Sequence, residues 1–137
     1  MTGSVFQHQR RIVYADCTVG NHVYYARYLD MLEEARGEML RAAGSPLAQL
    51  QEAGVIFPVI GLTVSYLAPA RYDDLITIAL RITELGAVRL NFGFQIFLAD
   101  KLLAEGETRH VCASLDEKPR RLPKDLAEKL RPFLHEK

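Results

Sequence analysis

One stretch constrains the fold more than any other: a long amphipathic helix that follows a short polar loop, within residues 14–40, YADCTVGNHVYYARYLDMLEEARGEML. Apolar side chains recur at the three- and four-residue spacing of one buried helical stripe, at Tyr28, Leu32, Ala35, Met39 and Ala42. Asn21 is the candidate N-cap, and Gly44 is a candidate left-handed stop after the last turn. A helix with one apolar stripe has to pack that stripe against the rest of the chain.

The rest of the chain predicts mainly strands. A basic strand is expected over residues 6–14, and a brief helical turn that ends at Gly54 follows the long helix. Alternation of apolar and polar side chains predicts further strands over 55–67, 76–83, 90–98 and 102–115, before a short terminal helix over 126–134. Pro58 and Gly61 suggest a bulge or an edge position in the first of these four strands, which we expect to bury one face. This α+β pattern predicts an antiparallel sheet that wraps around one long central helix.

Length and composition exclude several classes of protein. The 137 residues predict a single domain, residues 1–137. Because 17 basic and 17 acidic residues cancel, no overall field attracts nucleic acid or an anionic membrane. No apolar run reaches the roughly 20 residues of a membrane span, and no signal peptide is evident, so a cytoplasmic location is expected. Cys17 and Cys112 lack metal-ligand spacing, and we expect two reduced thiols and no metal site.

The loop before the long helix carries the candidate chemistry. The first turn of a helix leaves backbone N–H groups unpaired and carries about half a positive charge, so it can polarise a carbonyl or hold an oxyanion. Asp16 is the nearest carboxylate, and it can act as a general base for water or as a nucleophile. It can equally only cap the loop. His22 can exchange a hydrogen bond with a reactant or simply pack at the helix start.

The order of these residues resembles the hotdog-fold thioesterases of the 4-hydroxybenzoyl-CoA thioesterase family, which commonly show Y-x-D-x-D-x-x-G-x-V-Y-x-A-x-Y-L and then a helical E-x-A-R. The resemblance continues through VSYLAPARYDD and AEGETRHVCASLDEKPRRLP and covers nearly the whole chain. It implies hydrolysis of an acyl-CoA or acyl-carrier-protein thioester without a metal or another cofactor. It also implies a homodimer, or a dimer of dimers, with the active site at the subunit boundary.

The chain departs from the family motif at one decisive position. Asp16 matches the first acidic position, and Thr18 stands at the second, which carries the catalytic Asp in the benzoyl-CoA enzymes. The loop also resembles that of enediyne polyketide thioesterases, which have an uncharged residue there, so the resemblance still implies hydrolysis. Thr18 is then expected to position water or substrate. By the same match the Tyr25 backbone N–H is the oxyanion donor, a kind of contact that contributes about 3 kcal/mol.

Other residues are candidates for binding the substrate. Tyr24 and Tyr28 are expected to form the acyl-pocket wall or the core. Glu33 could reach a cleft, because one branch of hotdog thioesterases places its carboxylate on the central helix. Coenzyme A phosphates need basic side chains, for which turns and strand ends offer Arg71, Arg89 and Arg120.

Two alternatives to the acyl-CoA hydrolase follow from the same residues. The basic cluster of the benzoyl-CoA enzymes is replaced here by residues 86–88, Gly-Ala-Val, so a carrier-protein substrate stays open. Thr18 at the catalytic position favours a non-catalytic acyl-thioester binding protein as the rival function. A hotdog dehydratase is disfavoured, because no His in the chain is followed by the Pro-rich loop and helix carboxylate that those sites use.

Overall fold

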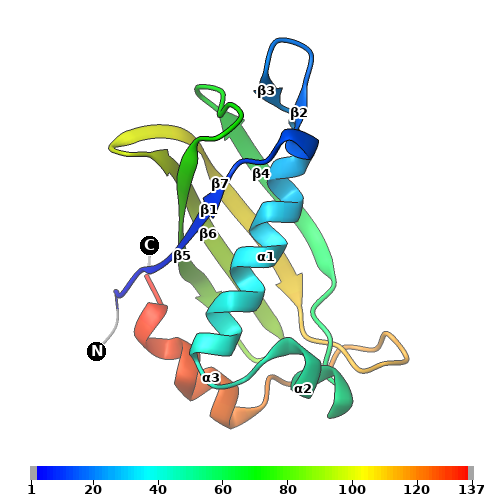
Figure 1. Cartoon of the computed structure of the whole chain (residues 1–137). Coiled ribbons are helices and arrows are strands. Elements are labelled where there is room, and N and C mark those ends of the chain that lie inside the picture. Colours follow the sequence, from blue (N-terminus) through cyan, green and yellow to red (C-terminus); the bar gives the residue numbers. More distant parts are fainter. Residues whose placement is uncertain (1–2, 136–137) are drawn as a thin grey trace.

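The structure is a computed structural model that describes residues 3–135, and the predicted helix lies at its centre. Helix α1, Arg27–Ala42, crosses the concave face of a five-stranded antiparallel sheet (Figure 1). Its predicted stripe is buried at Tyr28, Leu32, Ala35 and Met39, while Ala42 in the last turn is exposed. The stripe is therefore confirmed except at its final position. The helix buries its apolar face against the sheet, as the α+β pattern requires.

The predicted start of the helix is wrong. Asn21 is not the N-cap, because α1 begins later, at Arg27, with Ala26 as a cap that makes no side-chain bond. Asn21 instead has a φ of 59° and lies in the turn between two short strands, β2 (Cys17–Thr18) and β3 (His22–Val23). Asparagine tolerates this left-handed conformation, and the same preference for breaking regular structure makes it a common N-cap. Asn21 therefore does interrupt regular structure, but it does so in a turn and not at the start of the helix.

The predicted end of the helix is confirmed. Gly44 has a φ of 88°, its N–H donates to the Arg41 carbonyl at 3.0 Å, and the Ser45 N–H donates to the Leu40 carbonyl at 2.9 Å. These two bonds form a Schellman motif, which satisfies carbonyl groups that the last turn leaves open. The second predicted helix, α2 (Leu47–Glu52), follows directly.

The sheet contains the predicted strands in the order β1-β5-β6-β7-β4. Their bounds are Phe6–Arg11 (β1), Val59–Tyr66 (β4), Leu75–Leu85 (β5), Arg89–Leu98 (β6) and Lys101–Val111 (β7). Consecutive strands β5, β6 and β7 form hairpins, and β4 lies on the far edge beside β7. The pairing shifts register between Val59 and Gly61, which confirms the expected bulge.

Strand β4 does not bury one face as its alternation predicted. Ile60, Leu62 and Tyr66 are 40–49% exposed, and only Val64 and Gly61 are partly buried. Pairing on one edge and distance from the helix leave this strand largely open in the single chain. The apolar side chains of β4 are therefore open to contact with another molecule.

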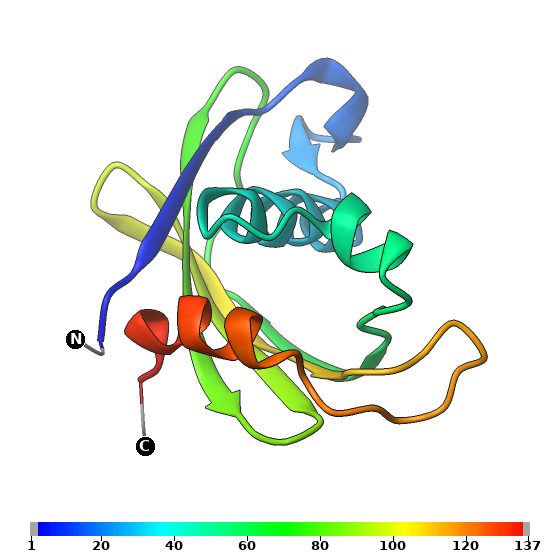
Figure 2. The ribbon, with the colours of Figure 1, turned by 90° about the horizontal axis from the view of Figure 1, so that it is seen from below.

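The sheet curves around α1 so that its inner face and the helix form one core (Figure 2). Eight inward residues of β5 and β6 are at most 3% exposed: Ile76, Ile78, Leu80, Ile82, Leu90, Phe92, Phe94 and Ile96. Helix α3, Lys124–Leu130, adds Leu126 and Leu130 to this core and leads into a 3₁₀ turn, η2, at Arg131–Phe133. Within residues 3–135, no helix is long and apolar enough to cross a membrane.

Candidate active site

The backbone at the start of α1 leaves the Tyr25 amide group open. The N–H groups of Tyr24, Arg27 and Leu29 are bonded, to the carbonyls of Asp16, Tyr24 and Ala26 at 2.9, 2.8 and 3.1 Å. The Tyr25 N–H has no acceptor among residues 3–135. Tyr25 lies just before the helix, where the helix dipole is positive. A carbonyl oxygen of a ligand can therefore accept from this amide without displacing a bond within the protein.

The hairpin of β2 and β3 brings two predicted residues together, and one of them, His22, lines a cleft with Tyr25. Thr18 and His22 lie directly opposite each other in the hairpin, and opposed residues of an antiparallel pair project to the same side. Both are exposed, and neither side chain bonds to another described residue. The imidazole and the hydroxyl are therefore both free to hold water or substrate.

A cleft of about 300 Å³ opens between the hairpin and the end of β4. Its walls are His22, Val23, Tyr25, Tyr28, Tyr66, Leu67, Ala68 and Pro69. The Tyr28 hydroxyl is buried and accepts from the Ala70 N–H at 3.1 Å, and burial raises the pKa of Tyr28. The Tyr66 hydroxyl donates to the Tyr25 carbonyl at 2.8 Å. Two tyrosine rings thus give an apolar floor beside the open amide, suited to an acyl group.

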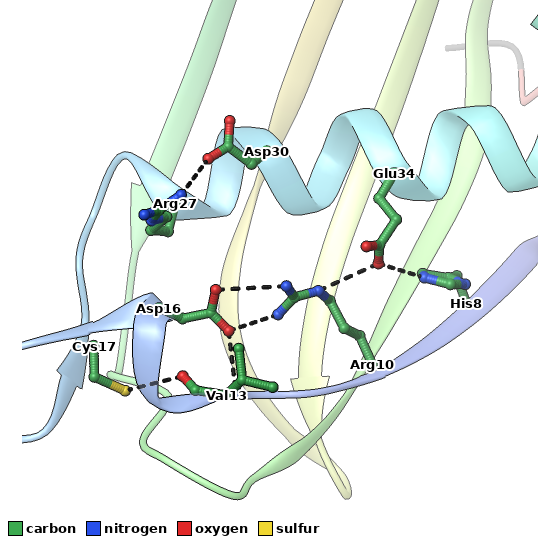
Figure 3. A network of polar contacts seen from close by, with 8 residues as sticks. All are labelled: His8, Arg10, Val13, Asp16, Cys17, Arg27, Asp30 and Glu34. Carbon is green, nitrogen blue, oxygen red and sulfur yellow. Dashed lines mark hydrogen bonds and ion pairs between the residues drawn. The ribbon is translucent and has the colours of Figure 1, made fainter.

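Asp16 does not line the cleft and instead belongs to a network of charged groups (Figure 3). It belongs to the 3₁₀ turn η1, Tyr14–Asp16, and is 5% exposed. Its Oδ2 accepts from Arg10 Nη1 at 2.8 Å and from the Val13 N–H at 2.9 Å. Arg10 Nε also lies 3.3 Å from Glu34, which contacts His8 at 2.9 Å. This network of charged groups links β1, η1 and α1.

This pairing sets the protonation of Asp16. Burial by itself raises the pKa of the carboxyl, but the hydrogen bonds from Arg10 and Val13 outweigh it and hold the pKa below its ordinary value. The hydrogen bond to Asp16 also raises the pKa of Arg10, so the pair is fully charged. A carboxylate with a lowered pKa and occupied oxygens is a weak base.

The loop after β4 holds the hairpin in place. The Arg71 guanidinium donates to the Gly20 carbonyl at 3.4 Å, and the Tyr72 N–H donates to the Asn21 side chain at 3.2 Å. The Val23 N–H donates to the Ala70 carbonyl at 3.0 Å. Arg71 is exposed and therefore lies at the rim of the site, where the sequence analysis expected a phosphate contact.

The other predicted binding residues do not line this cleft. Tyr24 is 45% exposed and stacks on the Tyr25 ring, at a centroid distance of 4.8 Å. Glu33 lies in the middle of α1 and lines a different cavity. Arg89 begins β6, at the end of the sheet away from Tyr66. Arg120 donates to the carbonyls of Ala53 and Gly54 at 3.4 and 3.2 Å, beyond α2.

Sequence reasoning missed two residues that shape the site. Arg10 was seen only as part of a basic strand, and its partner Asp16 is adjacent only after β1 and η1 fold together. Tyr66 was assigned to an ordinary strand, although its hydroxyl fixes the peptide next to the open amide. No cluster of three or more His, Cys, Asp or Glu side chains that could hold a metal occurs in the part of the chain that the structure describes.

A curved sheet around one long helix, with an open amide and a cleft at the helix start, is the arrangement expected of a hotdog-fold thioesterase. The chain belongs to the thioesterase-like superfamily, whose sequence model matches residues 12–130. It is 39% identical over 128 residues to YbgC of Escherichia coli, an acyl-CoA thioester hydrolase, covering 92% of this chain and 96% of the relative.

Solved structures show the same fold. Slr0204 from Synechocystis, a 1,4-dihydroxy-2-naphthoyl-CoA thioesterase, superposes with a TM-score of 0.86 at 27% identity, covering 93% of this chain and 96% of that one. The dynemicin thioesterase has a TM-score of 0.88 at 16% identity, covering 96% and 99%, and its likeness bears on the fold alone. Together the comparisons confirm the predicted family, fold and thioesterase class, and they do not favour the non-catalytic binding protein.

Proposed function

We propose that the protein hydrolyses acyl-CoA thioesters in the cleft at the start of α1. The observation that carries the proposal is the Tyr25 N–H, which has no acceptor among the described residues and lies beside an open cleft with aromatic walls. The E. coli and Synechocystis relatives act on CoA thioesters by name, which favours CoA over an acyl-carrier protein as the thiol. No metal or other cofactor enters the reaction.

The thioester carbonyl oxygen accepts from the Tyr25 N–H, which draws electrons from the carbonyl carbon. Water attacks that carbon while His22 takes a proton from the water. The negative charge of the tetrahedral intermediate then lies on the oxygen that accepts from the Tyr25 amide. The C–S bond then breaks, and the leaving thiolate takes the proton from His22. The products are a free acid and CoA. Thr18, opposite His22, holds the attacking water.

Asp16 has a positioning role in this proposal. Its carboxylate is occupied by Arg10 and Val13, and its backbone carbonyl accepts from the Tyr24 N–H at 2.9 Å. The bond from Tyr24 fixes the peptide group directly before the one that carries the Tyr25 amide. The contacts that fix Asp16 therefore also help to fix the oxyanion donor. Asp16, at the first acidic position of the motif, can thus matter for catalysis without taking a proton.

The active unit in this proposal is a homodimer that forms through β4. An edge strand with exposed apolar side chains is prone to pair with another chain, and Ile60, Leu62 and Tyr66 present such an edge. Tyr66 also lines the cleft, so a second copy on β4 would complete its outer wall. Residues far from the cleft in one chain, such as Arg89 and Arg120, can then serve the CoA of the other chain. The acyl-CoA substrate agrees with the expected cytoplasmic location.

Release of CoA from a panel of aromatic, short-chain and long-chain acyl-CoAs, followed with a thiol reagent, tests the function. We expect turnover by the unmodified protein, and a fall in kcat of about 100-fold in His22→Ala because general acid–base catalysis is lost. His135→Ala is the matched control, since His135 binds the Ser4 carbonyl far from the cleft. Absence of turnover across the panel would reject the function. An unchanged kcat in His22→Ala would reject His22 as the base.

A further inference from the structure

The Tyr25 carbonyl is held by a side chain from the edge strand β4. In a regular α-helix this carbonyl would accept from the Leu29 N–H, four residues further on. Here the Leu29 N–H donates to the Ala26 carbonyl instead, at 3.1 Å. The Tyr25 carbonyl accepts from the Tyr66 hydroxyl at 2.8 Å, and it has no other hydrogen-bond donor within residues 3–135. The Tyr66 hydroxyl therefore takes the place of a helical bond.

Three consecutive peptide groups at the open amide are tied by hydrogen bonds. The first donates, through the Tyr24 N–H, to the Asp16 carbonyl at 2.9 Å. The second carries the open Tyr25 N–H, and its carbonyl accepts from the Arg27 N–H at 2.8 Å. The third is the one whose carbonyl accepts from Tyr66. The first two bonds join nearby backbone groups, whereas the third joins the peptide to the sheet. Tyr66 therefore sets how this segment is oriented relative to the sheet.

Tyr66 is itself well placed for this task. Its backbone pairs with Ala104 in β7, and the Leu67 N–H beside it donates to the Leu103 carbonyl at 2.8 Å. Its ring packs against the ring of Tyr28, which is 3% exposed, at a centroid distance of 5.5 Å. Burial raises the pKa of Tyr66, so the hydroxyl keeps its proton and remains a donor.

The ring and the hydroxyl of Tyr66 have separate surroundings. The residue lines the cleft and is 46% exposed, so the ring can touch an acyl group. The hydroxyl is engaged by the Tyr25 carbonyl. A change that removes the hydroxyl and keeps the ring therefore separates a contact with the substrate from an effect on the amide.

We propose that Tyr66 is a positioning residue for thioester hydrolysis, whose hydroxyl directs the Tyr25 N–H toward the substrate carbonyl. This role rests on the proposed function, because Tyr66 acts through the oxyanion donor assigned there. The carbonyl oxygen gains negative charge in the transition state, so a well-aimed N–H lowers the barrier more than it strengthens substrate binding. The contact lies within one chain, so a second copy on β4 can cover the open part of the ring without breaking it.

Tyr66→Phe, assayed on the panel of acyl-CoAs, tests the proposal. We expect kcat to fall about 10-fold, less than the roughly 100- to 1,000-fold cost of losing an oxyanion donor outright. KM should stay within about twofold, because the ring remains in the cleft. Every thioester presents the same carbonyl, so the loss should be equal for aromatic, short and long acyl groups. Tyr72→Phe is the matched control, since the Tyr72 ring contacts Tyr14 and does not line the cleft.

A second measurement follows the amide directly and needs no turnover. In protein with isotope-labelled tyrosine, the backbone amide signal of Tyr25 is identified by its absence from Tyr25→Phe. This signal should shift in Tyr66→Phe and stay in place in Tyr72→Phe. Circular dichroism and the mass from light scattering should match those of the unmodified protein in both variants, which excludes loss of folding or of assembly as the cause.

Each contrary result is distinct. An unchanged kcat in Tyr66→Phe, beside an active unmodified protein, would overturn the positioning role and leave the proposed function standing. A loss that varies with the acyl group, or that appears in KM alone, would assign Tyr66 to the wall of the cleft instead. An unmoved Tyr25 amide signal, or an altered mass, would also overturn the role. Absence of turnover by the unmodified protein would reject the proposed function and this role together.

Discussion

Removing Arg10 should destabilise the protein far more than removing an ordinary surface arginine. In Arg10→Gln, the Asp16 carboxylate, whose side chain is 7% exposed, would lose its charged partner and keep only the Val13 N–H. Most of the free-energy cost of breaking a buried ion pair comes from the charge that is left buried without its partner. Asp16 cannot turn outward easily, because its own backbone is bonded to Val13 and Tyr24.

The magnitude follows from the burial of both partners. Breaking a fully buried ion pair typically costs 3–5 kcal/mol, and the 22% exposure of the Arg10 side chain lets some water reach the site, so we expect about 2–3 kcal/mol. For a chain of 137 residues this corresponds to a fall in Tm of about 7–10 °C. The exposed pair of Arg41 and Glu38 gives the control, because Arg41→Gln should change stability by less than about 0.5 kcal/mol.

Thermal and urea denaturation at one protein concentration would measure both variants. Arg10→Gln combined with Asp16→Asn should cost less than the sum of the single changes, because the double variant leaves no buried charge. Equal stability losses in Arg10→Gln and Arg41→Gln would refute the reasoning, as would strictly additive effects in the double variant.

The same pair predicts an acid response with a definite sign. The folded pKa of Asp16 is below its ordinary value of 3.8, so the unfolded chain binds more protons as pH falls. The stabilisation by the pair is complete above pH 3.8 and is lost as pH falls through the folded pKa. The double variant of Arg10→Gln and Asp16→Asn should lack this loss of stability. If its acid unfolding midpoint equals that of the unmodified protein, this prediction is contradicted.

Two further predictions concern His110 and β4. Burial lowers the pKa of His110 from 6.5 to about 4, so the stability it gives as a neutral group should be lost as pH falls from 6.5 to 4. The loss is at most about 3 kcal/mol, and His110→Gln should flatten the pH dependence in urea denaturation, whereas an unchanged slope would contradict the assignment. For β4, light scattering should give the mass of a dimer, and Leu62→Lys should shift it toward the monomer with unchanged circular dichroism. A monomeric unmodified protein would reject the interface.

The sequence predicts the central architecture well because its strongest signals are local. The apolar stripe of α1 and its stop at Gly44 depend on residues within a few turns of each other, and both are confirmed. The hairpins of β5, β6 and β7 are equally local. The helix start was misplaced because Asn21 suits a left-handed turn as well as a cap, and no local signal distinguishes the two.

The site is less predictable because it is assembled from distant segments. The motif indicated Thr18, His22 and Tyr25. In the structure His22 and Tyr25 line one cleft, and Thr18 pairs with His22 in the hairpin but does not line that cleft. The motif could not show that Arg10 forms an ion pair with Asp16, since that contact depends on how β1 meets η1. It also could not place Arg89 and Arg120 relative to the cleft, because their positions depend on how distant segments of the chain meet.

The hydrogen bond from Tyr66 to the Tyr25 carbonyl has an evolutionary consequence. In the proposed dimer, Tyr66 belongs to the strand that faces the second copy, and in the proposed mechanism Tyr25 supplies the amide that meets the substrate. A lineage that altered how its subunits associate would therefore disturb turnover at the same time, unless another residue took over that tether. Quaternary structure and reaction rate are consequently expected to drift together across the relatives of this chain, and a change of acyl preference should often accompany a change of assembly.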